Sequence, residues 1–298
     1  MNKMYESLYQ RSKGQDKTKV FAHFNLSRID PATGEKTFEP WLPYYQLSDL
    51  AQPDNEHWQS DEMEDGRRKF PEGNMEILAS YLNFTFMRLQ EECKILYSED
   101  GCRACFNTGL LGRKYCEDIY AFFDRNRNGG ANQDWFFKEF ATKSDAMRRN
   151  LMDGFSGFPE VAEYYNADNY RDLFFNLEYT TIVAADHIVE DNIDRFPVMM
   201  RNNLHLACAA LQGAVDKLYS QVRRNYKLAV PHWHEGHIQL LLPLYLSDPR
   251  KADLALVVER VDAQKCYIAK TILTMDMAYK DARLICRPDR DWLKEKDW

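Results

Sequence analysis

The sequence lacks a long hydrophobic run. None of its 298 residues fall in an apolar stretch of about 18, the length that a membrane-spanning helix needs. The N-terminal stretch MNKMYESLYQRSKGQDKTK also lacks the hydrophobic segment of a signal peptide. We therefore expect a soluble, cytoplasmic protein without a membrane partner.

Positive charge is also in deficit. The chain has 39 Lys and Arg against 46 Asp and Glu, a net charge of −7. Because non-specific affinity for nucleic acid comes from neutralised phosphates, this balance argues against indiscriminate binding to a polyanion, although it allows a local basic groove. Hydrophobic residues make up 45% of the sequence, which suits a substantial core and excludes intrinsic disorder.

The cysteines lack the pairing of a structural zinc site. There are seven, an odd number, and only Cys102 and Cys105 form a close C-x2-C pair. No second close pair and no H-x3-5-H partner follows it. In a strand, Cys102 and Cys105 would also point to opposite faces. We expect buried free thiols, and no metal at these cysteines.

Hydrophobic periodicity predicts the α+β fold class, with antiparallel sheet segments flanking a helical middle. Two long amphipathic helices are expected at residues 74–92, with Asn74 as N-cap, and at residues 203–225. A short helix is expected at residues 275–282, and a turn at Asn128-Gly129-Gly130. Alternating segments predict these strands: KILYSED, RACFNTGL, EDIYAFFDRN, DWFFKEFAT, HIQLLLPLYL, ADLALVVERV and KCYIAKTIL.

Proline and glycine interrupt the first 70 residues or so, which read as loop or extended chain. We therefore expect an irregular N-terminal wrapping segment over residues 1–73 and a single α+β domain over residues 74–298. No internal repeat is evident in the sequence.

The segment H-W-H-E-G-H, His232–His237, allows two interpretations. Its histidine spacing can serve a metal, with Glu235 as base or ligand. Pro231 and Gly236, however, prevent the single helix that an H-E-x-x-H zinc site requires. We favour a polar turn with half-exposed histidines and expect no metal there.

A histidine among carboxylates is the candidate catalytic feature. In ADHIVEDNIDRFP, residues 185–197, we select Asp186 and His187. If this segment is helical, His187 shares one side with Asp191, and a carboxylate there can tune its basicity. The alternative is an amphipathic helix with an acidic face.

Two basic segments are candidates for phosphate binding. The first ends the second long helix, where Asn225, Tyr226 and Lys227 combine an aromatic ring with positive charge. The second is at the end of the chain, where arginines alternate with apolar residues: Arg283, Arg287 and Arg290. The alternative is that these cations pair with the excess of carboxylates.

Most of residues 75–293 is covered by stretches that carry a family resemblance: YLNFTFMRLQEE, CFNTGLLGRKYCEDIYAFFDRN, DHIVEDNIDRFP, NYKLAVPHW, IQLLLPLYL, ADLALVVER and TILTMDMAYKDARLICRPDRDWL. In them the chain resembles an uncharacterised bacterial domain family, found alone or fused downstream of LOTUS (OST-HTH), cold-shock-like and NYN nuclease modules. The company of these modules implies a role linked to RNA.

The resemblance also singles out polar positions: Asn107, Thr108, Gly109, Asp186, His187, Asn192, Arg195, Asn225, Lys227, Asp276, Asp281 and Arg283. The H-W-H-E-G-H segment is a variable connection in the family. Asp281 departs from the usual asparagine, and a carboxylate there would repel a phosphate. With the basic segments, this gives the expected nucleotide- or RNA-binding set: Asn107, Thr108, Arg195, Asn225, Tyr226, Lys227, Arg283 and Arg287.

Three functions remain open on the sequence. The first is an RNA- or nucleotide-binding protein of bacterial RNA metabolism or of stress and defence, with a protein partner that carries RNA-binding or nuclease modules. The second is a phosphate-directed enzyme, a nuclease or phosphoesterase, with His187 as acid or base and a divalent metal held by Asp186 or Glu259. The third is an oligomerising scaffold.

Overall fold

The structure is a computed structural model that describes residues 3–24, 26–29, 36–52, 56–64, 67–127, 132–288 and 292–293. The chain divides into two compact units. Unit 1 comprises residues 1–60 and 65–163, and unit 2 comprises residues 61–64 and 164–298. The expected turn at residues 128–130 lies outside the described residues. The expected split into a segment of residues 1–73 and a domain of residues 74–298 stays a prediction. Its test is whether residues 74–298 fold without residues 1–73.

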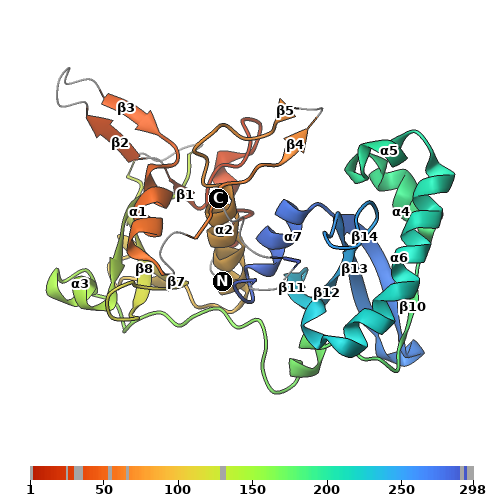
Figure 1. The fold of residues 1–298 in the computed structure, drawn as a ribbon. Coiled ribbons are helices and arrows are strands. Elements are labelled where there is room, and N and C mark those ends of the chain that lie inside the picture. Colours follow the sequence, from red (N-terminus) through yellow and green to blue (C-terminus); the bar gives the residue numbers. More distant parts are fainter. Residues whose placement is uncertain are drawn as a thin grey trace. The chain divides into compact units, whose positions relative to one another are not determined.

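Unit 1 is built on a five-stranded sheet of order β1-β9-β8-β7-β6 (Figure 1). The strands are β1 (Ala22–His23), β6 (Leu96–Tyr97), β7 (Arg103–Leu111), β8 (Asp118–Arg125) and β9 (Trp135–Thr142). The long helix α2 (Glu76–Glu91) covers one face, where Phe86 contacts Phe106 of β7. The short helix α3 (Lys143–Arg148) covers the other, where Ala146 packs with Cys105.

The N-terminal part of unit 1 is more regular than the sequence suggests. It contains the short helices η1 (Lys17–Lys19) and α1 (Leu42–Leu50) and the strands β2 (Leu26–Ile29), β3 (Lys36–Glu39) and β5 (Arg67–Arg68). A proline lies in the first turn of α1, where its fixed φ favours a helix start and its missing N–H needs no partner. The prolines of this stretch therefore begin a helix that we did not predict.

Unit 2 is built on a second five-stranded sheet, of order β10-β14-β13-β12-β11. The strands are β10 (Thr180–Ile182), β11 (Val230–His234), β12 (His237–Leu244), β13 (Leu254–Val261) and β14 (Cys266–Leu273). Around them lie α4 (Ala185–Asn192), α5 (Val198–Arg201), α6 (Leu204–Arg224) and α7 (Met275–Ala282). The unit also contains β4 (Met63–Glu64), η2 (Tyr170–Leu173), η3 (Ile193–Arg195), η4 (Tyr226–Leu228) and η5 (Asp262–Gln264).

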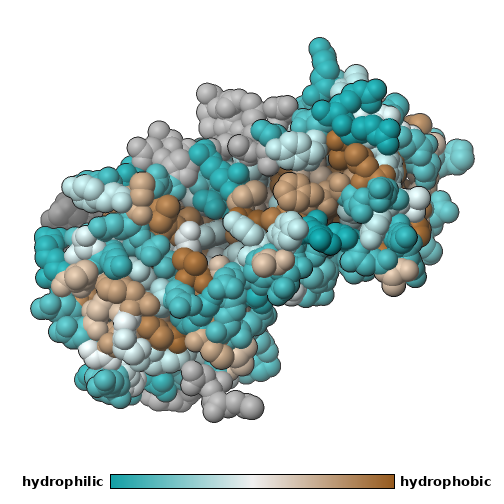
Figure 2. Space-filling view, turned by 90° about the horizontal axis from the view of Figure 1, so that it is seen from below, coloured by the Kyte–Doolittle hydropathy of each residue, from teal (hydrophilic) through white to brown (hydrophobic). Residues whose placement is uncertain are grey.

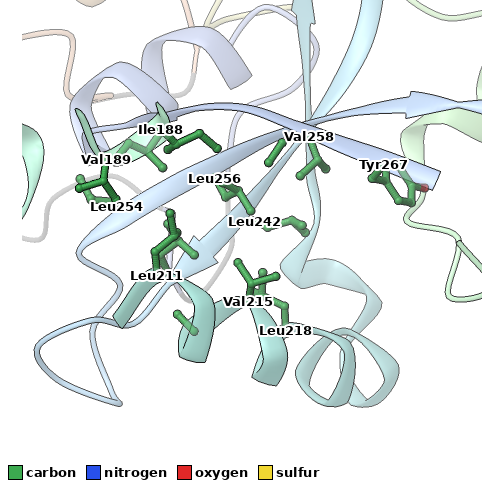
Figure 3. Close-up of a cluster of buried hydrophobic side chains, with 14 of the residues drawn as sticks. Ile188, Val189, Leu211, Val215, Leu218, Leu242, Leu254, Leu256, Val258 and Tyr267 are labelled. Carbon is green, nitrogen blue, oxygen red and sulfur yellow. The ribbon is translucent and has the colours of Figure 1, made fainter. Parts of the chain in front are cut away.

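The core of unit 2 lies between α6 and the sheet. Leu211, Val215 and Leu218 follow the helical period on the buried side of α6. Figure 3 shows them pointing toward strand residues that include Leu242 and Leu256. Helix α4 closes the same face with Ile188 and Val189, while α7 lies on the opposite face of the sheet. Both faces of β12 and β13 are therefore buried.

The two units share one topology. In each, a short strand precedes a long helix, four strands form an antiparallel meander, and a short helix follows the last strand. The short first strand pairs in parallel with the last strand in both units, β1 with β9 and β10 with β14. The long helix covers one face of the sheet and the short helix the other. Unit 2 thus repeats the topology of unit 1, although the sequences show no repeat.

The correspondence extends to single residues. The register between the last two strands shifts once in each unit, and the extra residue is Lys138 in β9 and Lys270 in β14. Each bulged lysine faces a carboxylate of the neighbouring strand, Asp124 at 3.6 Å and Glu259 at 3.4 Å. After each last strand, a threonine hydroxyl caps the short helix. A β-bulge re-aims a side chain, and here both bulges turn a lysine toward an acidic partner.

The α+β class is confirmed, and so are the predicted strands and the helices at residues 74–92, 203–225 and 275–282. The sheets are mixed, however, because the short first strand of each unit pairs in parallel with the last strand of its antiparallel meander. The edge strands β1 and β10 are too short to show a period in sequence. Asn74 is buried and accepts bonds from the backbone of Ser60 and Glu76 just before α2.

Helix α6 offers a matched test of its core. Leu211 is fully buried, whereas Leu206, on the same helix, is 45% exposed. We expect Leu211→Ala to lower the free energy of unfolding by roughly 2–5 kcal/mol, because it leaves a cavity against the sheet. Leu206→Ala should change it by less than about 1 kcal/mol. Urea denaturation of both variants checks this; equal losses would contradict the assigned face of α6.

Candidate nucleotide and RNA site

In unit 1, the expected binding residues Asn107 and Thr108 are buried in β7. The Asn107 side chain accepts a bond from the Gly109 N–H at 2.9 Å, and the Thr108 hydroxyl donates to the carbonyl of Ile119 at 2.8 Å. Gly109 has φ +74°, and a Cβ there would lie 2.7 Å from the Tyr81 hydroxyl. The register between β7 and β8 shifts after Asn107, and these contacts stabilise the irregular backbone there. The Asn-Thr-Gly sequence therefore has a structural role that needs no ligand.

In unit 2, the expected catalytic pair lies on α4. Both Asp186 and His187 are exposed. Asp186 lies next to Cys208 of α6, and burial together with this carboxylate raises the pKa of the Cys208 thiol. In the part of the chain that the structure describes, His187 makes no hydrogen bond or ion pair with Asp191.

The expected arginines of unit 2 differ in their surroundings. Arg195, in η3, donates to the carbonyl of Ile272 at the end of β14, so it ties α4 to the sheet. Arg283 follows α7 and is 8% exposed. Arg287 is exposed. Arg290 lies outside the described residues. Of the C-terminal arginines that are described, only Arg287 faces solvent.

Asn225 sets the direction of the chain after α6. Its backbone N–H caps α6 on Gln221, and its side chain accepts a bond from the Lys227 N–H at 3.1 Å, which starts η4. The indole of Trp292 donates to the carbonyl of Leu228 at 2.9 Å and holds the other end of η4. The structure therefore brings three of the expected residues together and leaves the side chains of Tyr226 and Lys227 exposed.

A neighbour of Tyr226 was missed in the sequence. Phe174 and Phe175 follow η2 in extended conformation, so they point in opposite directions. Phe175 stacks on Tyr267 of the core with ring centroids 4.5 Å apart. Phe174 is 53% exposed and lies 6.4 Å from the ring of Tyr226, which is 64% exposed. The one sequence signal for an exposed ring at Phe174 is the pair of consecutive phenylalanines, because in an extended segment only one of the two can face the core.

We name the exposed group Tyr170, Arg171, Phe174, Tyr226 and Lys227 the aromatic–basic surface. Arg171 lies over the Tyr170 ring at 5.9 Å. Lys227 forms no ion pair within the described residues. Exposed aromatic rings next to cations can stack bases and hold phosphates.

The H-W-H-E-G-H segment is a β-hairpin rather than a loop between a helix and a strand. β11 and β12 pair directly, and the turn residues Glu235 and Gly236 have φ 45° and 90°, as a two-residue hairpin of type I′ requires. His232 pairs with Gln239 across the hairpin, and His234 pairs with His237. All four side chains therefore lie on the same face of the sheet. Strands do fix these side chains, contrary to the expectation of a turn.

This face of the hairpin is polar and partly buried. His232 is 2% exposed, and neither ring nitrogen has a partner among the described residues. Burial, with the nearby His234 and His237, lowers the pKa of His232 to about 3. Glu259 is occupied by Gln239 at 3.1 Å and by Lys270 at 3.4 Å. Within the described residues, no three His, Cys, Asp or Glu side chains are placed to hold a metal ion.

Asp281 of α7 lies near the same face. Burial raises its pKa to about 6, against the influence of Lys280 and His234, which lower it. A carboxyl group with such a pKa is partly protonated near neutral pH, so it offers a weaker charge than an ordinary aspartate.

Two mixed sheets, each covered by helices on both faces, define the class of protein: a two-unit α+β protein. The chain belongs to the family described as Domain of unknown function (DUF3825), whose model matches residues 47–292. No curated protein and no solved structure matches the chain. Among the described residues, no helix combines the length and apolar character needed to cross a membrane.

Asp281 gives a pH-dependent prediction. Its folded-state pKa of about 6 lies above the ordinary 3.8, so the ionised carboxylate destabilises the fold as the pH rises through 6. We expect Asp281→Asn to raise the free energy of unfolding at pH 8 by up to roughly 3 kcal/mol, and to change it little near pH 4.

Urea denaturation at both pH values checks this, with the exposed Asp191→Asn as control. A loss of stability at pH 8 would show that the charged form of Asp281 is required.

Proposed function

We propose that unit 2 binds single-stranded RNA or a nucleotide through the aromatic–basic surface. One observation carries the proposal: two exposed rings, Phe174 and Tyr226, lie 6.4 Å apart, and the next residue, Lys227, forms no ion pair within the described residues. Large aromatic side chains lose more by exposure to water than most residues, so a pair of them on the surface favours a ligand that covers both.

The chemistry of the surface fits a nucleic acid strand. Every base has a π face that can stack on an aromatic ring whatever its identity, and the cations follow the backbone. Arg171 and Lys227 are supported by Arg223, which is exposed at the end of α6. A few cations on a chain of net charge −7 limit non-specific binding to duplex DNA.

The family resemblance supports the same proposal. The resemblance implies relatives that are fused to LOTUS, cold-shock-like and NYN nuclease modules, which are RNA-handling domains. We propose a cytoplasmic, bacterial protein of RNA metabolism or of stress and defence, with a protein partner that supplies such a module. Binding is favoured over the phosphate-directed enzyme because His187 has no carboxylate or cation at hydrogen-bond distance among the described residues.

Binding of a fluorescent, single-stranded RNA tests the surface by anisotropy. Tyr226→Ala should remove one stacking ring and weaken binding by roughly 5- to 150-fold. Lys227→Ala should weaken it by a smaller factor and reduce the salt dependence by about one phosphate contact. The matched control is Lys217→Ala, an exposed lysine on α6. Equal affinity of all variants and the wild type would contradict the proposal.

A specific observation favours the scaffold as a second candidate. Four apolar side chains are exposed on α5 and at the start of α6: Val198 at 75%, Met199 at 72%, Leu204 at 47% and Leu206 at 45%. On the face seen in Figure 2, hydrophobic residues interrupt a largely hydrophilic surface. An apolar group of this kind fits a self-association surface, which a second copy of the chain would cover.

Light scattering after size-exclusion chromatography tests this second candidate. If a second copy covers the patch, Met199→Glu should convert a dimer or larger oligomer into a monomer, because it buries a charge in the interface. The control is Met147→Glu, an exposed methionine of α3 in unit 1. A wild-type chain that is monomeric at high micromolar concentration would rule the scaffold out.

A further inference from the structure

Unit 1 contains a pocket of about 810 Å³ between its N-terminal segment and the sheet. This volume lies within the range of small-molecule and cofactor sites. The residues that line the pocket come from the segment before α1, from α1 itself, from β1 and β9, from the connection between β8 and β9, and from the start of α2 with the nearby Phe70. Much of it therefore precedes residue 47, where the family match begins.

Aromatic rings form one wall of the pocket. Tyr44 of α1 stands at its centre, with Phe24 stacked on it at 5.3 Å and an angle of 29°. Trp41 and Tyr9 lie 5.9 Å from the Tyr44 ring, and Trp41 is only partly buried. A partly open ring next to a stacked cluster is a surface on which a planar base can lie.

A buried polar group of this wall lacks a partner. Tyr44 is 3% exposed, and its hydroxyl makes no hydrogen bond within the described residues. Burial, with Tyr9 and Glu76 nearby, raises the pKa of Tyr44 well above its usual value, so the group remains a hydrogen-bond donor. Buried polar groups nearly always have partners, and an unpaired hydroxyl at a pocket points to a ligand that accepts its proton.

The rim of the pocket is positively charged. Arg11, Lys13 and Lys17 line it, and among the described residues of the lining Glu76 is the single carboxylate. The adjacent Lys19 pairs with Glu6 at 2.7 Å, but the three rim cations form no ion pair in the part of the chain that is described. Arg11 lies over the Phe84 ring at 5.7 Å, and cations that form no ion pair among the described residues offer a site for an anion.

The local structure fixes this rim. The Asp16 side chain accepts from the Thr18 N–H at 2.9 Å and starts η1 at Lys17. The Gln15 side chain accepts from the Arg11 N–H at 2.8 Å and closes the turn that carries Arg11 and Lys13. Gln133, which also lines the pocket, is 6% exposed and contributes a side-chain amide.

We propose that this pocket binds a nucleoside phosphate, either free or as the terminal nucleotide of an RNA. The base lies against Trp41 and the Tyr44 cluster, and the Tyr44 hydroxyl donates to it or to the ribose. The phosphates contact Arg11, Lys13 and Lys17. This site is separate from the aromatic–basic surface of unit 2 and adds a second, nucleotide-sized ligand to the proposed function.

Calorimetric titration of the full chain tests the pocket. The probes are the four ribonucleoside triphosphates, a 5′-phosphorylated tetranucleotide, and inorganic triphosphate. We expect Trp41→Ala to weaken nucleotide binding by about tenfold or more, because stacking on one ring is lost. Lys17→Ala should weaken it by a smaller, salt-dependent factor. Lys19→Ala, whose ion pair lies outside the lining, should change it less than about twofold.

Tyr44→Phe keeps the ring and removes the hydroxyl, so it separates binding from folding. We expect an unchanged melting temperature without ligand and weaker binding with it. If a ribonucleoside triphosphate binds, the ligand is a free nucleotide. If only the 5′-phosphorylated tetranucleotide binds, the ligand is the end of an RNA. Absence of binding to all probes at millimolar concentration, equal binding of inorganic triphosphate, or full affinity in Trp41→Ala and Tyr44→Phe would overturn the proposal.

Discussion

Burial of the central strands on both faces is the constraint on which each unit depends. Residues 119–123 of β8 and residues 254–258 of β13 are buried without interruption, so each sheet needs a helix on either face. The long helices α2 and α6 and the short helices α3 and α7 meet this need in the same order along the chain. The two units therefore share a topology because each covers both faces of its sheet in the same way, with a long helix before the meander and a short helix after it.

The same constraint places the candidate sites at the margins. A sheet that is covered on both faces has no open platform for a ligand, so polar side chains gather where strands and helices end. Asn225 turns the chain out of α6, and Phe175 anchors its neighbour so that Phe174 faces outward. In unit 1, the segment before α1 closes over the edge of the sheet at β1 and leaves a pocket there.

Long periodic segments could be predicted from the sequence, because periodicity reports burial within one element. The strands β6 to β9 and β12 to β14 and the helices α2, α6 and α7 lie where the pattern places them. The two edge strands were missed since pairing in parallel with β9 or β14 is a long-range contact with no local signal. The His232 hairpin was missed because Glu235, a non-glycine residue, adopts positive φ in its turn.

The sites were predictable only in part. Tyr226 and Lys227 are exposed together as their composition suggests, whereas the side chains of Asn107 and Thr108 bond to backbone groups of β7 and β8. Neighbours from distant segments depend on the tertiary fold: Phe174 lies beside Tyr226, and Arg11 lines the same pocket as Tyr44.

The most direct measurement of the RNA interface is photo-crosslinking of a single-stranded RNA that carries 4-thiouridine, with the crosslinked peptides identified by mass spectrometry. RNA binding by the aromatic–basic surface predicts crosslinks at Phe174 and Tyr226. Crosslinks confined to other parts of unit 2, such as α4 around His187, would contradict this account.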